Sequence, residues 1–94
     1  MTIIRSRRFT VRLLGILHHI AQDKTGASRS FKDQLDKQIR DISNFPYKYR
    51  PSIYFDDTNI RDMVFKGYTI IYEVDRQNDQ IGIMDIFNRN KPVE

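Results

Sequence analysis

The sequence predicts an α+β fold with the element order β-α-α-β-β-β, in which two N-terminal helices pack on one face of a mostly antiparallel sheet. Two observations predict this fold. Apolar residues recur at steps of three and four between residues 6 and 42, as on helical faces, whereas residues 60–87 hold three apolar runs separated by short polar turns. The 94 residues are enough for one core, so residues 1–94 are predicted to form a single domain.

The composition limits the kinds of site that the chain can build. The sequence contains no cysteine, which excludes disulfides, thiolate metal sites and cysteine nucleophiles, and which fits a reducing compartment such as the cytoplasm. No uncharged apolar stretch is long enough to cross a membrane. The formal charge of +4 favours an acidic partner, either nucleic acid or an acidic polypeptide, although such a charge also serves solubility.

The first elements are a short strand and a helix. Residues 2–5 are β-branched and suit a strand, and residues 6–23 form a helix that Ser6 can cap. One face of this helix is apolar, and its members are Phe9, Leu13, Ile16, Leu17 and Ile20.

The second predicted helix covers residues 30–42, where Phe31, Leu35, Ile39 and Ile42 repeat the same spacing. Ser30 and Asp33 stand three apart, as in a capping box, and Gly26 is expected to end the first helix or turn the chain in a left-handed conformation. Because the link is short, the two helices should form an antiparallel pair.

Residues 43–59 hold two prolines and several aromatics and sustain no period, so they are predicted to be a long connection. Two interpretations apply to it. Its aromatics alternate with Lys48 and Arg50, the combination that stacks bases and neutralises phosphates. Alternatively, Phe45, Ile53 and Phe55 seal the helix pair against the sheet, and this structural interpretation is favoured.

The last three strands are predicted at residues 60–65, 68–74 and 81–87. Lys66 and Gly67 form a tight turn between the first two. In the middle strand both faces are apolar, with Tyr72 on one and Ile71 on the other, which indicates a central position. Since two helices cover only one face of the sheet, the other face is expected to meet solvent or to receive another molecule.

Few residues could carry chemistry. His18 and His19 are neighbours on a helix and cannot both hold one metal ion, so no metal or cofactor is predicted. Asp56 and Asp57 could hold a cation, but a turn with local backbone hydrogen bonds is commoner. The remaining candidates, expected to converge at one end of the strands and grip phosphates or an acidic peptide, are Arg61, Lys66 and Arg89, although scattered solvated charge is the alternative.

The order and spacing of these segments resemble a known family. Two helices, then "NFPYKYR", then "IRDMVFKGYTIIYEVD" and a closing strand with a basic tail are similar to the RelE/ParE superfamily of bacterial toxins from type II toxin–antitoxin systems. The resemblance spans nearly the whole chain. It implies a toxin neutralised by a cognate antitoxin that lays an acidic or amphipathic segment across the sheet.

The two branches of that superfamily imply different activities. RelE-like members cleave mRNA on the ribosome, and in that branch Arg61, Lys66 and Arg89 would be the catalytic cations. Where such members often carry His or Tyr, this chain has Phe87 and Asn88, which exchange no proton near neutral pH. ParE-like members bind and inhibit DNA gyrase, which requires only a surface, so the ParE-like branch is favoured. Thr69 replaces the usual Arg of both branches, which leaves a third possibility, a non-toxic binding module.

Overall fold

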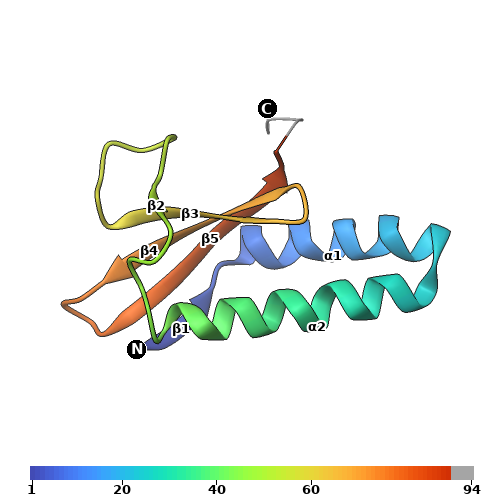
Figure 1. Cartoon of the computed structure of the whole chain (residues 1–94), viewed down its shortest axis with the longest axis horizontal. Helices are drawn as coiled ribbons and strands as arrows, with labels where there is room; N and C mark the ends of the chain where they lie inside the picture. Colours follow the sequence, from blue (N-terminus) through green and yellow to red (C-terminus); the bar gives the residue numbers. More distant parts are fainter. Residues whose placement is uncertain (90–94) are drawn as a thin grey trace.

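The computed structural model describes residues 1–89, which form a helical hairpin packed on a five-stranded sheet (Figure 1). The helices and strands are β1 (Thr2–Arg5), α1 (Arg7–Asp23), α2 (Thr25–Ile42), β2 (Arg50–Pro51), β3 (Ile60–Phe65), β4 (Tyr68–Asp75) and β5 (Gln80–Asn88). The strand order in the sheet is β1-β5-β4-β3-β2, with β1 parallel to β5 and the other pairs antiparallel. The predicted α+β class and mostly antiparallel sheet are confirmed, and β2 is an addition.

The helical hairpin forms as predicted, but its turn differs. The side chain of Ser6 accepts a hydrogen bond from the amide of Phe9 and caps α1, as expected. Lys24, in an extended conformation, is the single residue between the helices, so α2 already begins at Thr25. Gly26 and Ser30 therefore lie inside α2, and the predictions of a left-handed Gly26 and of a capping box at Ser30 are wrong. Because α2 packs along α1, the helix begins at Thr25, before the capping signal at Ser30.

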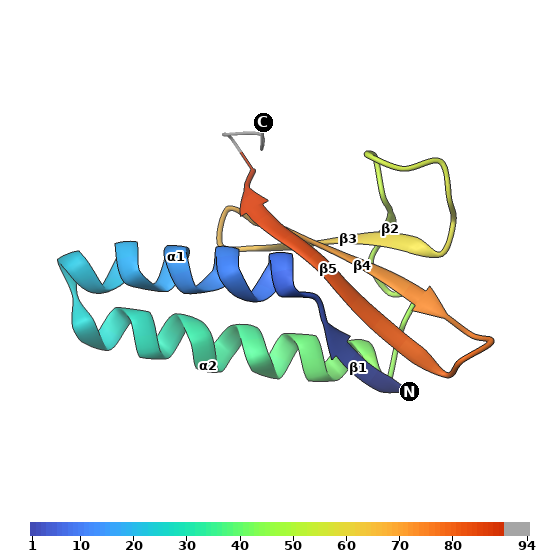
Figure 2. The same cartoon turned by 180° about the vertical axis from the view of Figure 1, so that it is seen from behind.

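The strand β1 is tied to both layers. It pairs with residues 80–83 of β5 at the edge of the sheet and leads directly into α1 (Figure 2). Arg5 donates a hydrogen bond to Asp36 of α2 at 3.0 Å, and Lys32 donates to the same carboxylate at 2.7 Å. Partial burial raises the pKa of Asp36, but the hydrogen bonds from Lys32 and Arg5 outweigh burial, so the pKa of Asp36 is lowered.

The central position predicted for the 68–74 strand is confirmed, because β4 lies between β3 and β5. The tight turn at Lys66 and Gly67 is also confirmed, with positive φ at both residues. The pairing of β4 with β5 is shifted between Ile71 and Tyr72, so that Met84 has no partner opposite it. Because Met84 is an extra residue in β5, Ile83 before it and Ile86 after it both pack on the core.

The hydrophobic core lies between the helices and one face of the sheet. Tyr72 of β4 is fully buried there, and its hydroxyl donates a hydrogen bond to the carbonyl of Pro46 at 2.7 Å. That bond attaches the long connection to the centre of the sheet. The other buried members of the core are Phe9, Leu13, Phe31, Leu35, Ile39, Ile42, Met63, Phe65, Ile70, Val74, Ile81, Ile83 and Ile86.

The second face of the sheet is partly covered by the chain itself. The connection between β2 and β3 stands over it (Figure 1). Thr69 and Ile71 of β4 point to this side and are buried, and Phe55 of the connection lies beside Ile71. The prediction that nothing in the chain covers this face is therefore wrong in part. Phe45, Ile53 and Phe55 all remain exposed, so the prediction that they seal the helices against the sheet is wrong. Tyr47 and Tyr49 pack on the core instead.

Among residues 1–89, neither helix is sufficiently long and apolar to serve as a membrane span.

Removal of the Tyr72 hydroxyl should change how stability depends on pH. Burial, outweighing the nearby Arg61, raises the pKa of Tyr72 from 10.0 to about 12. Between pH 10 and 12 the unfolded chain therefore loses a proton that the folded chain keeps, and the wild-type free energy of unfolding falls by an extra amount on the order of 2 kcal/mol. Tyr72→Phe should cost about 1 kcal/mol at pH 7 and lack this extra decline, as measured by urea unfolding.

Tyr54→Phe is the matched control, because Tyr54 is 46% exposed. It removes a tyrosine hydroxyl but leaves Tyr72 in place, so the extra decline between pH 10 and 12 should remain. Parallel pH profiles for wild type and Tyr72→Phe would show that the Tyr72 phenol is not held neutral in the fold.

Candidate functional site

The three cations predicted to converge do not all meet. Arg61 lies at the start of β3, Lys66 in the turn after β3, and Arg89 directly after β5. Because β3 and β5 are both antiparallel to β4, which lies between them, they run in the same direction, and both begin at the same end of the sheet. Lys66 and Arg89 share one end of the sheet, where the Arg89 amide donates to the Gly67 carbonyl at 2.8 Å. The expectation that Arg61 joins them is wrong.

Arg61 holds the long connection in place. Its Nε donates a hydrogen bond to the carbonyl of Thr58 at 2.8 Å, and its guanidinium donates to the carbonyl of Tyr49 at 3.1 Å. The same guanidinium lies 4.7 Å from the centre of the Tyr47 ring, which Arg76 approaches to 5.0 Å. The guanidinium is thus engaged by backbone and ring, as suits an anchoring role.

A second group of residues forms a seam that sequence reasoning missed. We define the α1–β5 seam by Arg8, Arg12, Gly15 and His19 of α1 and residues 84–88 of β5. The four helix residues are spaced so that they share one helical face. Two hollows lie along the seam, one of about 450 Å³ beside Arg12 and Gly15 and one of about 340 Å³ beside Arg8 and Met84.

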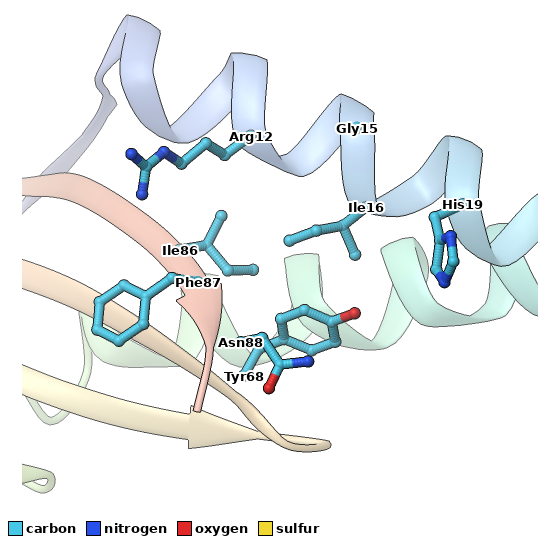
Figure 3. Close-up of a pocket in the computed structure, with 8 residues that line it drawn as sticks. All are labelled: Arg12, Gly15, Ile16, His19, Tyr68, Ile86, Phe87 and Asn88. Atoms are coloured by element: carbon cyan, nitrogen blue, oxygen red, sulfur yellow. The ribbon is translucent and has the colours of Figure 1, made fainter. Parts of the chain in front are cut away.

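Figure 3 shows the larger hollow. Gly15 has no side chain, and no atom would contact a Cβ placed there, so the helix backbone is open to close approach. The ring of Tyr68 lies between α1 and the strands, and His19 points from α1 toward the same space. The remaining lining residues are Ile16, Ile86, Phe87 and Asn88, so the hollow combines an apolar floor with polar and cationic walls.

An ion pair divides the two hollows. Asp85 lies 3.3 Å from Arg12 and 3.9 Å from Arg8, and its carboxylate also accepts a hydrogen bond from the Ile86 amide at 2.8 Å. One carboxylate thus faces two guanidinium groups, and the seam keeps a net positive charge. The Arg8 side chain is 67% exposed, which leaves it accessible to an incoming carboxylate.

The β5 side of the seam is a sheet edge. β1 pairs only with residues 80–83, and the chain leaves the sheet at Ser6, whose hydroxyl donates to the Met84 carbonyl at 2.7 Å. Residues 84–87 therefore have no strand beside them on this side within the described part of the chain. An exposed edge offers backbone hydrogen-bonding groups to an extended partner.

The seam was hidden from sequence reasoning because its two sides are more than 70 residues apart, as the Arg12–Asp85 pair shows. One signal was available: Arg8 and Arg12 stand four apart, which places two cations on one helical face. Among residues 1–89, no three side chains of His, Cys, Asp or Glu are grouped to hold a metal ion. The seam presents charge, apolar surface and, at residues 84–87, a sheet edge without a neighbouring strand, and these features can bind a partner.

Comparison with known proteins agrees with this geometry. The fold is that of a solved structure described as a chromosomal ParDE TA system from P. aeruginosa, with a TM-score of 0.75 and 15% identity over 94% of this chain and 95% of that chain. At that identity the likeness shows the fold alone, so the class that the fold defines is a small two-layer α+β protein.

The family follows from the sequence. The model described as "ParE toxin of type II toxin-antitoxin system, parDE" matches residues 3–92, and the chain belongs to this family of toxins. The predicted RelE/ParE resemblance, with the ParE-like branch favoured, is confirmed. No curated protein sequence matches the chain significantly.

Alanine substitution of Arg61, Lys66 and Arg89, one at a time, should show which of the three side chains contributes to the free energy of unfolding. Arg61→Ala removes the partners of two backbone carbonyls and the stacking on Tyr47, and should lower the free energy of unfolding by roughly 1 to 3 kcal/mol. Lys66→Ala and Arg89→Ala should stay within about 0.5 kcal/mol of wild type in the same urea titration. An Arg61→Ala protein as stable as wild type would show that the guanidinium is not needed to hold the connection.

Proposed function

We propose that this toxin is neutralised by a cognate antitoxin that binds the α1–β5 seam, and that it acts by binding and inhibiting DNA gyrase. The observation that carries the proposal is the seam itself, a cationic and apolar channel beside an open sheet edge in a chain of the ParE toxin family. Gyrase inhibition would place the protein in the cytoplasm.

The seam suits an acidic amphipathic segment. Apolar side chains of such a segment would fill the two hollows, and its carboxylates would meet Arg8 and Arg12. The distance along α1 from Arg8 to His19 is eleven residues, or roughly 16 Å at 1.5 Å per residue. This length accommodates about three turns of helix or five residues of extended chain.

Binding to gyrase fits the chain better than cleavage of mRNA. Cleavage needs cations and proton-transfer groups gathered at one phosphate. Arg61 is held by two carbonyls and a ring at the start of β3, away from Lys66 and Arg89 at the other end of that strand. Inhibition by surface contact requires none of these groups to act together.

A supercoiling assay distinguishes the two activities. Purified gyrase with relaxed plasmid should lose supercoiling activity at micromolar toxin, and an equimolar amount of the cognate antitoxin should restore it. The matched assay uses translating ribosomes with a defined mRNA, which should remain uncut. Full supercoiling at micromolar toxin together with mRNA cleavage would replace gyrase inhibition by the ribonuclease activity.

Neutralisation of the seam charge should weaken the antitoxin complex. Arg8→Gln with Arg12→Gln removes two cations that meet acidic side chains, and should raise the Kd at least tenfold and reduce its salt dependence. Titration calorimetry at two salt concentrations measures both effects.

The control for this pair is Arg29→Gln with Lys37→Gln, which makes the same charge change on exposed positions of α2. It should leave the Kd within about threefold, and thermal melting checks the fold of both proteins. Equal weakening by the two double variants would mean that the antitoxin responds to overall charge and not to the seam.

A further inference from the structure

The connection between β2 and β3 ends in an exposed apolar group. We call residues 53–57 the loop tip. Its three consecutive apolar side chains are 66%, 46% and 43% exposed at Ile53, Tyr54 and Phe55. Single exposed apolar residues are ordinary, but three in succession on a folded loop mark a contact surface.

The loop tip is held firmly at its first end. The Ser52 amide donates to the Ile60 carbonyl at 2.8 Å, and the Ile53 amide donates to the Asp62 carboxylate at 3.1 Å. The Ser52 hydroxyl, on a residue only 7% exposed, accepts from the Tyr54 amide at 3.1 Å. Three successive backbone amides, those of Ser52, Ile53 and Tyr54, are thus fixed where the tip begins.

The second end is fixed as well. The carboxylate of Asp57 accepts a hydrogen bond from the Asn59 amide at 2.8 Å, and its carbonyl accepts from the Ile60 amide at 3.1 Å. The local turn expected at Asp56 and Asp57 is therefore present. With Arg61 bonded to the Thr58 carbonyl, the tip is preorganised, which lowers the entropy lost on binding.

The fold accepts a buried charge to hold this loop. The Asp62 side chain is 0% exposed. Its Oδ2 atom accepts the hydrogen bond from the Ile53 amide and lies 3.5 Å from the Arg50 guanidinium. Its Oδ1 atom has no hydrogen-bond partner among the described residues. Burial of a carboxylate without full hydrogen bonding disfavours stability. A costly group that fixes the position of an exposed loop indicates that the loop position matters for binding.

The charge of the loop indicates the kind of partner. Residues 51–59 contain Asp56 and Asp57 but no Lys or Arg, a formal charge of −2 in a chain of +4. Neither carboxylate forms an ion pair within residues 1–89. Two carboxylates repel phosphates, so the tip suits a protein surface that has an apolar pocket with a basic rim.

We propose that the loop tip is the element that contacts the toxin's protein target, with Ile53 inserted into an apolar pocket whose basic rim faces Asp56 and Asp57. This inference rests on the proposed function and adds the contact surface on the toxin. The tip also borders the seam. Phe55 lines the smaller hollow of the seam, and the ring centres of Tyr54 and Phe87 are 5.3 Å apart. Ile53 is the most exposed of the three and lines neither hollow.

Ile53→Lys tests the tip, and Leu14→Lys is its control. Leu14 is 62% exposed on α1, so both changes replace an exposed aliphatic residue by the same cation. For Ile53→Lys the toxin concentration that half-inhibits gyrase supercoiling should rise at least tenfold, because lysine loses the apolar contact and repels the basic rim. Leu14→Lys should inhibit like wild type, and both variants should bind the antitoxin with unchanged Kd.

Two outcomes in this assay overturn the proposal. Ile53→Lys inhibiting like wild type would show that the tip does not contact the target, and equal losses in both variants would show that the effect is one of charge. If wild type does not inhibit gyrase, the proposed target fails, and growth arrest on expression becomes the readout. Loss of arrest in Ile53→Lys alone then supports tip contact with another protein, whereas arrest by both variants overturns it.

Discussion

The structure depends on burial of β4 on both faces. On one face Tyr72 and Ile70 pack beneath the helical hairpin. On the other face Thr69 and Ile71 are also buried, and Phe55 of the connection that leads into β3 lies beside Ile71. A strand covered on both sides needs material on both sides, and this chain has helices for only one. The long connection supplies the second cover, so its position follows from the needs of the central strand and brings Tyr54 and Phe55 beside β5.

Two adjacent residues of β3 hold the long connection in a defined conformation. Successive side chains of a strand point to opposite faces, so Arg61 and Asp62 act on opposite sides of the sheet. Arg61 holds the carbonyls of Tyr49 and Thr58, and Asp62 holds the amide of Ile53. The connection is thus fixed from both sides near the point where it joins the sheet, and the exposed tip and the α1–β5 seam lie next to each other on one surface.

Local patterns in the sequence were enough to predict the hairpin, the strands 60–65 and 68–74 and the turn at Lys66 and Gly67, because each depends on periodicity or turn chemistry within a few residues. The failures arose from non-local effects. Packing against α1 overrode the helix start at Ser30, and the parallel relation of β3 and β5 separated Arg61 from Arg89. The Arg12–Asp85 pair could not be found from spacing, since it joins the two ends of the chain.

The central claim is that this ParE-family chain is a toxin whose binding surface is blocked by its antitoxin. The most direct measurement is growth of bacteria in which the toxin is induced alone or together with its cognate antitoxin. The account predicts growth arrest with the toxin alone and normal growth when both proteins are made. Normal growth in cells that accumulate folded toxin without antitoxin would contradict it.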